Sequence, residues 1–320
     1  MKECFICGHS LLVSQKALSD DRYGYPGQFS LMRCRECGHA FLENAFTSEQ
    51  LTDLYSNYYP RSQFDLDAYQ PHQVAKGFGA WLNGSKSSAF RWVPPNVRVL
   101  DIGCGFGESL GYHAARGCDV YGMEADENIR RVADKFGFKV HVGLFDPGIY
   151  EPDFFDYVTM DQVMEHVTDP LETLQGVARV LKPGGKAILT TPNANGWGAK
   201  VFGRKWINWH APYHLQFYSK QSMRRLAEKA GLEIESARTI TASAWLHFQW
   251  LHLLTCPKLG QPSDFWAGSA CGKQVDFTMA QKVIMRLLSL VNRARINYLI
   301  TRLFDALGMG DNHVFILSKS

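Results

Sequence analysis

One short stretch of this chain constrains its fold more than any other. It runs from Val97 to Gly107, where an apolar segment, residues 97–102, precedes three glycines at alternate positions. Residues 108–116 then have the composition of a helix. Glycine lets a backbone turn tightly and approach a ligand, and the first turn of a helix offers unpaired N–H groups. The stretch therefore predicts a strand, a glycine loop and a helix that together cradle a nucleotide-like ligand.

The spacing inside the loop narrows the class of ligand. The glycines at 103, 105 and 107 form Gly-x-Gly-x-Gly, not the Gly-x-Gly-x-x-Gly that is typical of dinucleotide sites. Asp101 precedes the loop, and an acid there suits a ligand with a cationic or amino-bearing end better than a pyrophosphate. The alternative is a glycine turn that only links a strand to a helix. The segments that follow favour the ligand cradle.

The composition is that of an ordinary soluble globular protein, with 46% hydrophobic and 20% charged residues among 320. A net charge of +3 is too small to indicate a nucleic-acid partner. No apolar run follows a basic start, and no apolar segment reaches the ~20 residues that a membrane span needs. We therefore expect a cytoplasmic protein without nucleic acid as a partner.

Four of the eight cysteines are clustered near the start of the chain. Cys4 and Cys7 form one Cys-x-x-Cys pair, Cys34 and Cys37 form another, and each pair is followed by Gly-His. Two such pairs supply four thiolates for a closed tetrahedral zinc site, which is structural because it leaves no open position. The alternative is free cysteines or a redox pair. We predict a zinc ribbon over residues 1–42.

Strands and helices alternate over residues 97–240, which predicts a parallel α/β sheet. The second strand, residues 119–123, ends at Glu124, which lies 21 residues after Gly103. An acid at that distance, at the carboxyl end of a strand, can accept hydrogen bonds from both hydroxyls of a ribose. The alternative is a solvated surface glutamate.

Several further motifs follow in order: Glu165-His166, Asp169-Pro170 and residues 181–185, Leu-Lys-Pro-Gly-Gly. Together with residues 99–107, they resemble the class I S-adenosylmethionine (SAM) dependent methyltransferases, in the group of quinone and sugar methyltransferases. The cysteine segment resembles modules on some sugar methyltransferases. The resemblance implies a Rossmann-like core of seven strands, with an N-terminal zinc ribbon and a helical insertion before the last strand.

The resemblance also implies which residues hold SAM. An acid after the third strand would meet the adenine, and either Asp146 or the neighbouring Phe145, by stacking, takes that place. The segment of residues 43–96, a helical linker, would close over SAM with one of its tyrosines, Tyr55, Tyr58, Tyr59 or Tyr69. The alternative for each of them is packing between the two modules. The predicted SAM residues are Asp101, Gly103, Cys104, Gly105, Gly107, Glu124, Phe145, Asp146 and Asp161.

Four residues are candidates for removing a proton from the acceptor: Glu165, His166, Tyr213 and His214. They follow core strands, where ligands bind in such sheets. Some quinone methyltransferases hold a divalent metal on Glu-x-x-Glu-His, but Gln162 occupies the first position here. The aromatic segment of residues 206–219 predicts either the wall of an acceptor site or a buried cluster.

Residues 241–311 are predicted to form a helical insertion, and residues 312–320 the last strand, antiparallel between the fifth and sixth. Within the insertion, residues 280–307 have the pattern of one amphipathic helix. Such a helix can form a lid, a dimer contact or a peripheral contact with a membrane. The sequence leaves the oligomeric state open.

These observations predict a SAM-dependent methyltransferase with a small-molecule or glycan acceptor, namely a sugar or nucleotide-sugar of surface-polysaccharide or related glycan synthesis. One alternative is an O-methyltransferase for a quinone or a lipid-like phenol, which the apolar insertion favours. An RNA methyltransferase is disfavoured, because no dense basic stripe is present. A SAM-binding scaffold without turnover is the alternative outside the enzymes.

Overall fold

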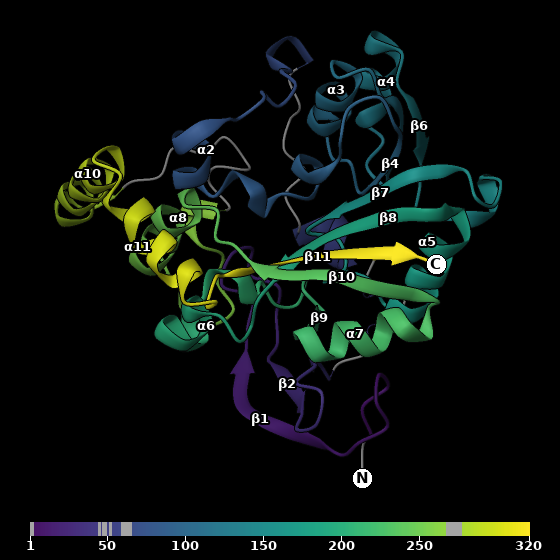
Figure 1. Cartoon of the computed structure of the whole chain (residues 1–320). Coiled ribbons are helices and arrows are strands. Elements are labelled where there is room, and N and C mark those ends of the chain that lie inside the picture. Colours follow the sequence, from purple (N-terminus) through teal and green to yellow (C-terminus); the bar gives the residue numbers. More distant parts are fainter. Residues whose placement is uncertain (1–2, 44–45, 47–49, 51–52, 59–65, 267–276) are drawn as a thin grey trace.

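A seven-stranded sheet forms the centre of the computed structural model (Figure 1), which describes residues 3–43, 46, 50, 53–58, 66–266 and 277–320. Its strand order is β10-β11-β8-β7-β4-β5-β6. The strands are β4 (Arg98–Ile102), β5 (Asp119–Glu124), β6 (Lys139–Val142), β7 (Phe155–Asp161), β8 (Leu181–Pro192), β10 (Leu232–Thr239) and β11 (Asn312–Lys319). The strands from β4 to β8 pair in parallel, and β11 runs antiparallel between β8 and β10. The predicted fold, including the place and direction of the last strand, is confirmed.

The helices of the core begin at capping residues. Asp169 accepts hydrogen bonds from two amides of the first turn of α5 (Pro170–Val180), and a capping box at Ser219 begins α7 (Lys220–Lys229). Their apolar faces pack on the sheet, as do those of α3 (Glu108–Ala114) and α4 (Ile129–Phe136). These helices hold the strands in register, so that the carboxyl ends of the parallel strands form one edge.

A second, four-stranded sheet in the order β1-β2-β3-β9 lies below the first in Figure 1. Three strands come from the cysteine segment: β1 (Leu11–Leu18), β2 (Phe29–Cys34) and β3 (Ala40–Leu42). The fourth, β9 (Gln216–Phe217), comes from the aromatic segment of the core and pairs antiparallel with β3. The cysteine segment is therefore joined to the core by a shared sheet.

Short helical turns connect the two sheets. They are η1 (Leu54–Tyr58), η2 (Leu66–Ala68), α2 (Gly77–Asn83), η3 (Ser85–Ser87) and η4 (Ala89–Trp92). Much of the first part of the predicted helical linker, residues 43–65, falls outside the described residues. The turn η4 packs against β7 and β8. The linker therefore reaches the sheet that carries the candidate site.

The insertion is helical, but its predicted single helix over residues 280–307 is wrong. Two helices, α10 (Met279–Arg293) and α11 (Ile296–Ala306), are separated at Arg295, whose φ of 57° is left-handed. After the bend, α11 packs on α8 (Ala244–Leu254) and on α2. Helix α10 also packs on α8 and lies at the outer edge of the molecule (Figure 1). Among the described residues, no helix combines the length and the apolar character needed to cross a bilayer.

Candidate active site and cysteine centre

The glycine loop between β4 and α3 has the predicted conformation. Gly103, Gly105 and Gly107 have φ angles of 71°, 56° and 82°, which other residues rarely adopt. A side chain at Gly103 would collide with Val163, whereas one at Gly105 would meet no atom within 4 Å. The loop is therefore closed at Gly103 and open to a ligand at Gly105, as a SAM cradle requires.

Asp101 lies beneath the loop. Its side chain is 3% exposed, and its carboxylate accepts hydrogen bonds from the hydroxyls of Ser109 and Thr159. Burial raises the pKa of Asp101 to about 7, although both hydroxyls oppose the shift. The Cys104 side chain is also buried, and its amide donates to the end of β5. Both residues brace the loop, and sequence reasoning misses the two hydroxyls because neither belongs to a motif.

Glu124, at the end of β5, places a carboxylate beside the open part of the loop. One of its oxygens accepts a hydrogen bond from the Gly105 amide at 2.9 Å, and the other accepts one from the Asp126 amide at 3.0 Å. These two bonds fix the carboxylate at the carboxyl edge of the sheet. A contact of this carboxylate with the hydroxyls of a ribose stays a prediction.

Replacing Glu124 with alanine is expected to weaken SAM binding by roughly 1.5–3 kcal/mol, the range of a hydrogen bond to a charged group. This corresponds to an increase in Kd of about 10- to 150-fold. Calorimetric titration with SAM measures the change. Glu127→Ala, an exposed glutamate three residues further on, is the matched control and should leave Kd unchanged. Equal Kd values for both variants would remove Glu124 from the site.

A tyrosine of the linker also contacts the loop. The hydroxyl of Tyr69 donates to the Gly107 carbonyl at 2.8 Å, and burial raises the pKa of Tyr69 to about 12. Tyr58 instead packs edge-on against Tyr25 of the cysteine segment, and Tyr59 lies outside the described residues. The structure thus places one tyrosine of the linker at the predicted cradle.

The two residues predicted near the adenine diverge after β6. Phe145 packs toward α5, where a side chain at Gly176 would collide with it. Asp146 is exposed and accepts a hydrogen bond from the amide of Gly148 at 2.7 Å. Leu144, which sequence reasoning misses, is 83% exposed directly after the strand. An exposed leucine that follows the end of β6 is a suitable apolar contact for a flat ring.

Asp161, at the end of β7, is paired within the protein. Its carboxylate accepts a hydrogen bond from the hydroxyl of Thr190 on β8. Burial raises the pKa of Asp161, and the positive charge of Arg91 in η4 opposes the shift. This predicted SAM residue therefore joins β7, β8 and the linker at the carboxyl edge of the sheet.

Three of the four predicted catalytic residues form one cluster. The ligand atoms of Glu165, His166 and His214 all lie within 4.8 Å of one another. The two imidazole rings are edge-on, with their centroids 4.7 Å apart. The cluster forms because the amides of Leu215 and Gln216 donate to the Glu165 carbonyl at 2.7 and 3.1 Å. Backbone pairing beside β9 thus brings together residues that lie 48 positions apart.

Hydrogen bonds to carbonyls fix the tautomers of both histidines. The Nδ1–H of His166 donates to the carbonyl of Tyr213 at 2.9 Å, and that of His214 donates to the carbonyl of Asn208 at 2.8 Å. A carbonyl can only accept, so the lone pair of each neutral ring lies on Nε2. Burial lowers the pKa of His166 to about 4 and that of His214 well below its usual value. Both rings are therefore neutral near pH 7, with an unprotonated Nε2.

The carboxyl group of Glu165 is fully buried beside these rings. Among the described residues, none donates to its oxygens a hydrogen bond of ordinary geometry. Burial raises the pKa of Glu165 to about 8, although its own amide and the nearby Thr191 hydroxyl oppose the shift. Glu165 is therefore mostly protonated at neutral pH, and the cluster carries little net charge.

We expect Glu165→Gln to become progressively stabilising, relative to the native chain, as the pH rises from 5 to 8. The unfolded state releases the Glu165 proton above about pH 4.5, whereas the folded state keeps it up to about pH 8. The native chain therefore loses up to ~1.4 kcal/mol of stability per pH unit in this window, and glutamine removes the loss. Urea unfolding at each pH measures it. Glu228→Gln, an exposed residue of α7, is the control; an equal pH dependence for both variants would contradict the burial argument.

The aromatic segment is mostly core. Tyr213 is fully buried, and its hydroxyl lies 3.5 Å from a carboxylate oxygen of Asp20 in the cysteine segment. Trp206 is 1% exposed and donates to Asp311, which also accepts from the Asn208 side chain at 2.9 Å. The sequence predicted either the wall of an acceptor site or a buried cluster, and Trp206 belongs to a buried cluster. Tyr213 contributes its carbonyl, not its hydroxyl, to the histidine cluster.

The four predicted zinc ligands lie together. The Sγ atoms of Cys4 and Cys37 are 3.7 Å apart, and those of Cys7 and Cys34 are 3.4 Å apart. A tetrahedral zinc with bonds of about 2.3 Å requires a sulfur–sulfur distance of about 3.8 Å. In each pair the amide of the following glycine donates to the carbonyl of the first cysteine, at 2.7 and 3.1 Å. The donor set and the two matching turns therefore fit one zinc ion.

Comparison with known proteins agrees with the methyltransferase class predicted from the sequence. A family model described as "Methyltransferase domain" matches residues 70–237. The chain is similar to the ubiquinone biosynthesis O-methyltransferase of Thiobacillus denitrificans, with 32% identity over 47% of this chain and 73% of the relative. The enzyme of the same name from Aeromonas salmonicida is 30% identical over 50% of this chain and 71% of its own.

Among solved structures, the chain resembles phosphoethanolamine N-methyltransferase 2 of Haemonchus contortus in complex with S-adenosyl-L-methionine. The TM-score is 0.50 at 18% identity, and the match covers 88% of this chain and 61% of the other. A likeness at this identity concerns the fold alone.

Proposed function

Because the chain belongs to the methyltransferase domain family, as the match over residues 70–237 shows, we propose that its SAM-dependent reaction methylates the hydroxyl of a quinone-type phenol. The relatives named above favour this acceptor over the sugar or nucleotide-sugar that the sequence motifs favoured. The observation that carries the proposal is the pair of neutral imidazoles, His166 and His214, at the carboxyl edge of the sheet.

Different residues of the chain would bind SAM and accept the proton in such a reaction. We propose that the glycine loop and Glu124 hold SAM, with Asp101 and Tyr69 bracing the loop. Bound SAM would supply an electrophilic methyl group: the acceptor oxygen would bond to the methyl carbon while the carbon–sulfur bond breaks, and S-adenosylhomocysteine would leave. Nε2 of His166 or His214 accepts the hydroxyl proton as the oxygen–carbon bond forms. The acceptor is held in place mainly by the surrounding buried groups.

A divalent cation is a second candidate for the same cluster. Gln162, which would be a ligand in the Glu-x-x-Glu-His pattern, donates its amide to Thr190 at 3.1 Å. His214 instead completes a group of three possible ligands with Glu165 and His166. A cation there would require an ionised Glu165, so its binding would release a proton. Titration with Mn²⁺ or Zn²⁺ at pH 7, with proton release measured against Glu165→Gln, tests this candidate.

The cysteine centre has a structural role in this proposal. We propose that Cys4, Cys7, Cys34 and Cys37 hold about one zinc per chain, since four thiolates close the shell of the ion. The centre would stabilise the second sheet, whose last strand, β9, lies next to His214 in the chain.

A direct test uses purified protein, labelled SAM and separate pools of catechol-type phenols, nucleotide sugars and RNA. Methylation of the phenols alone supports the proposed acceptor. Methylation of nucleotide sugars would support the sugar acceptor predicted from the sequence. SAM binding without formation of S-adenosylhomocysteine in any pool would support a SAM-binding scaffold without turnover. Contact of the insertion with a lipid surface stays a prediction, which vesicle flotation tests.

A further inference from the structure

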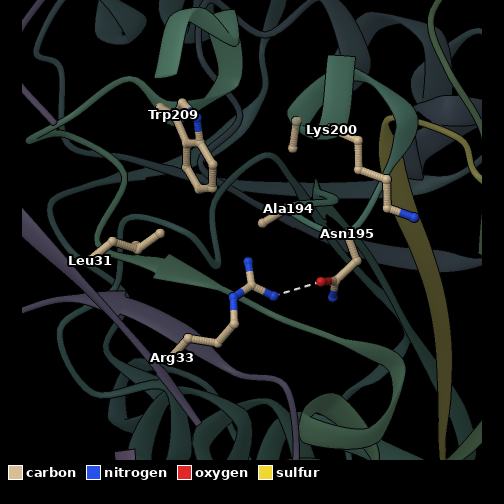
Figure 2. Close-up of a pocket in the computed structure, with 7 residues that line it drawn as sticks. Leu31, Arg33, Ala194, Asn195, Lys200 and Trp209 are labelled. Carbon is tan, nitrogen blue, oxygen red and sulfur yellow. Dashed lines mark hydrogen bonds between the residues drawn. The ribbon is translucent and has the colours of Figure 1, made fainter. Parts of the chain in front are cut away.

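A cleft of about 310 Å³ lies where the cysteine segment meets the chain that leaves β8 (Figure 2). One wall comes from β2, and the others come from the segment after β8, from α6 (Trp197–Phe202) and from η7 (Ile207–Trp209). The residues that line it are Leu31, Arg33, Ala194, Asn195, Ala199, Lys200 and Trp209. The cleft thus lies between a strand of the second sheet and the segments that follow β8.

The guanidinium of Arg33 lies in the middle of these residues (Figure 2). One of its nitrogens donates to the Asn195 side-chain oxygen at 2.6 Å, which holds the group in place. In the part of the chain that the structure describes, no carboxylate forms an ion pair with Arg33. An arginine that has only a neutral partner keeps donors for an oxyanion, which its planar group binds well.

The rest of the lining complements that charge. Lys200 adds a second, exposed cation, and the residues that line the cleft include no aspartate or glutamate. The ring of Trp209 and the side chains of Leu31 and Ala194 provide an apolar wall above Arg33 (Figure 2). This combination suits a ligand that carries an oxyanion on a flat apolar body.

Two of the segments that line the cleft are close in sequence to residues of the candidate active site. Ala194 follows Thr191, whose hydroxyl is near Glu165, and Trp209 precedes His214 by five residues. The cleft is therefore lined by two segments that also carry Thr191, which is near Glu165, and His214.

We propose that this cleft binds an oxyanion, a phosphate or a carboxylate, carried by the aromatic acceptor, with Arg33 as the principal contact and Trp209 against the ring. The proposal rests on the proposed function, because it identifies the ligand of the cleft with the acceptor. It adds that the acceptor is anionic as well as phenolic. Arg33 would then determine specificity without taking part in the chemical step.

Binding is measured first, without SAM and without turnover. Calorimetry with phenyl phosphate, benzoate, inorganic phosphate and phenol, at matched ionic strength, separates the oxyanion from the ring and phosphate from carboxylate. We expect phenyl phosphate or benzoate to bind more tightly than inorganic phosphate and phenol. Arg33→Gln should weaken that binding at least tenfold, Lys200→Gln should weaken it less, and Arg33→Lys should restore part of it.

Arg204→Gln removes a cation from the exposed turn between α6 and η7, outside the cleft, and is the matched control. Unchanged SAM affinity and circular dichroism show that each variant is folded. Equal affinity of Arg33→Gln and the native chain for every probe, or equal losses in Arg33→Gln and Arg204→Gln, would overturn the proposal.

Turnover then separates this inference from the proposed function. With an anionic phenol as acceptor, Arg33→Gln should raise KM at least tenfold and leave kcat nearly unchanged. Binding at Arg33 with no phenol methylated would refute the proposed function and the identity of the ligand as acceptor. Methylation of phenols with KM and binding unaffected by Arg33→Gln would refute the cleft alone.

Discussion

His166→Ala and His214→Ala are each expected to lower kcat by about 10²–10⁴-fold while SAM affinity stays nearly unchanged. This is the range for a positioned general base, and each ring has its proton on Nδ1 and its lone pair on Nε2. SAM would bind at Gly105, in the loop after β4, and at Glu124, at the end of β5, so the loss of an imidazole should leave SAM affinity unchanged. Turnover assays and SAM calorimetry on the same preparations measure the two effects separately.

The pH dependence of turnover checks the same assignment. Burial holds the pKa of His166 near 4, so its Nε2 stays available as the pH falls from 7 to 5. The activity of the native chain should therefore remain nearly level in that range and fall only as the pH approaches 4. A loss of activity centred near pH 6.5 would indicate an exposed histidine instead.

His247→Ala is the matched control, because His247 lies on α8 in the insertion, away from the cluster in the chain. It should keep normal turnover. If His166→Ala and His214→Ala are both folded and both retain near-normal kcat, base catalysis by histidine is wrong. The acceptor would then require positioning alone, because Glu165, with a pKa of about 8, is itself mostly protonated at neutral pH.

The cradle was predictable because local chemistry determines it. Three glycines at positive φ, an acid before them and a strand that ends at Glu124 are all visible in the sequence. The order of the seven strands follows from the family resemblance. The hydroxyls of Ser109 and Thr159, which brace Asp101, are not visible, because a serine or threonine in a regular element looks like any other.

The features that the sequence did not predict depend mostly on contacts between segments that are distant in the chain. Glu165 and His214 form one cluster because the amides of Leu215 and Gln216 donate to the Glu165 carbonyl beside β9, and a strand of two residues has no detectable pattern of its own. Trp206 is buried because Asp311, more than a hundred residues later, accepts its N–H. The break at Arg295 carries neither glycine nor proline, so an amphipathic pattern runs through it unchanged.

Replacing Cys34 with serine is expected to remove zinc from the protein and to unfold the second sheet. A serine hydroxyl is a poor substitute for a thiolate, and the free energy of zinc binding in comparable closed sites is on the order of 10–16 kcal/mol. Elemental analysis of protein purified without chelators should give about one zinc for the native chain and almost none for the variant. Limited proteolysis should then cut within residues 3–43.

The shared sheet extends this effect to the proposed reaction. Loss of β3 leaves β9 unpaired, and the residues beside β9 hold Glu165 and carry His214. Turnover should therefore fall by at least tenfold even though no cysteine touches the cluster. SAM affinity should change little, because the cradle lies between β4 and α3 in the other sheet.

Cys256→Ser, at a half-buried cysteine after α8, is the matched control and should keep zinc, fold and turnover. Zinc retained in Cys34→Ser would show that Cys34 is not a ligand. Loss of zinc with normal turnover would show that β9 keeps its place without β3. Loss of SAM binding together with zinc would show that the two sheets fold as one cooperative unit, in which the cysteine centre stabilises the cradle as well as the histidine cluster.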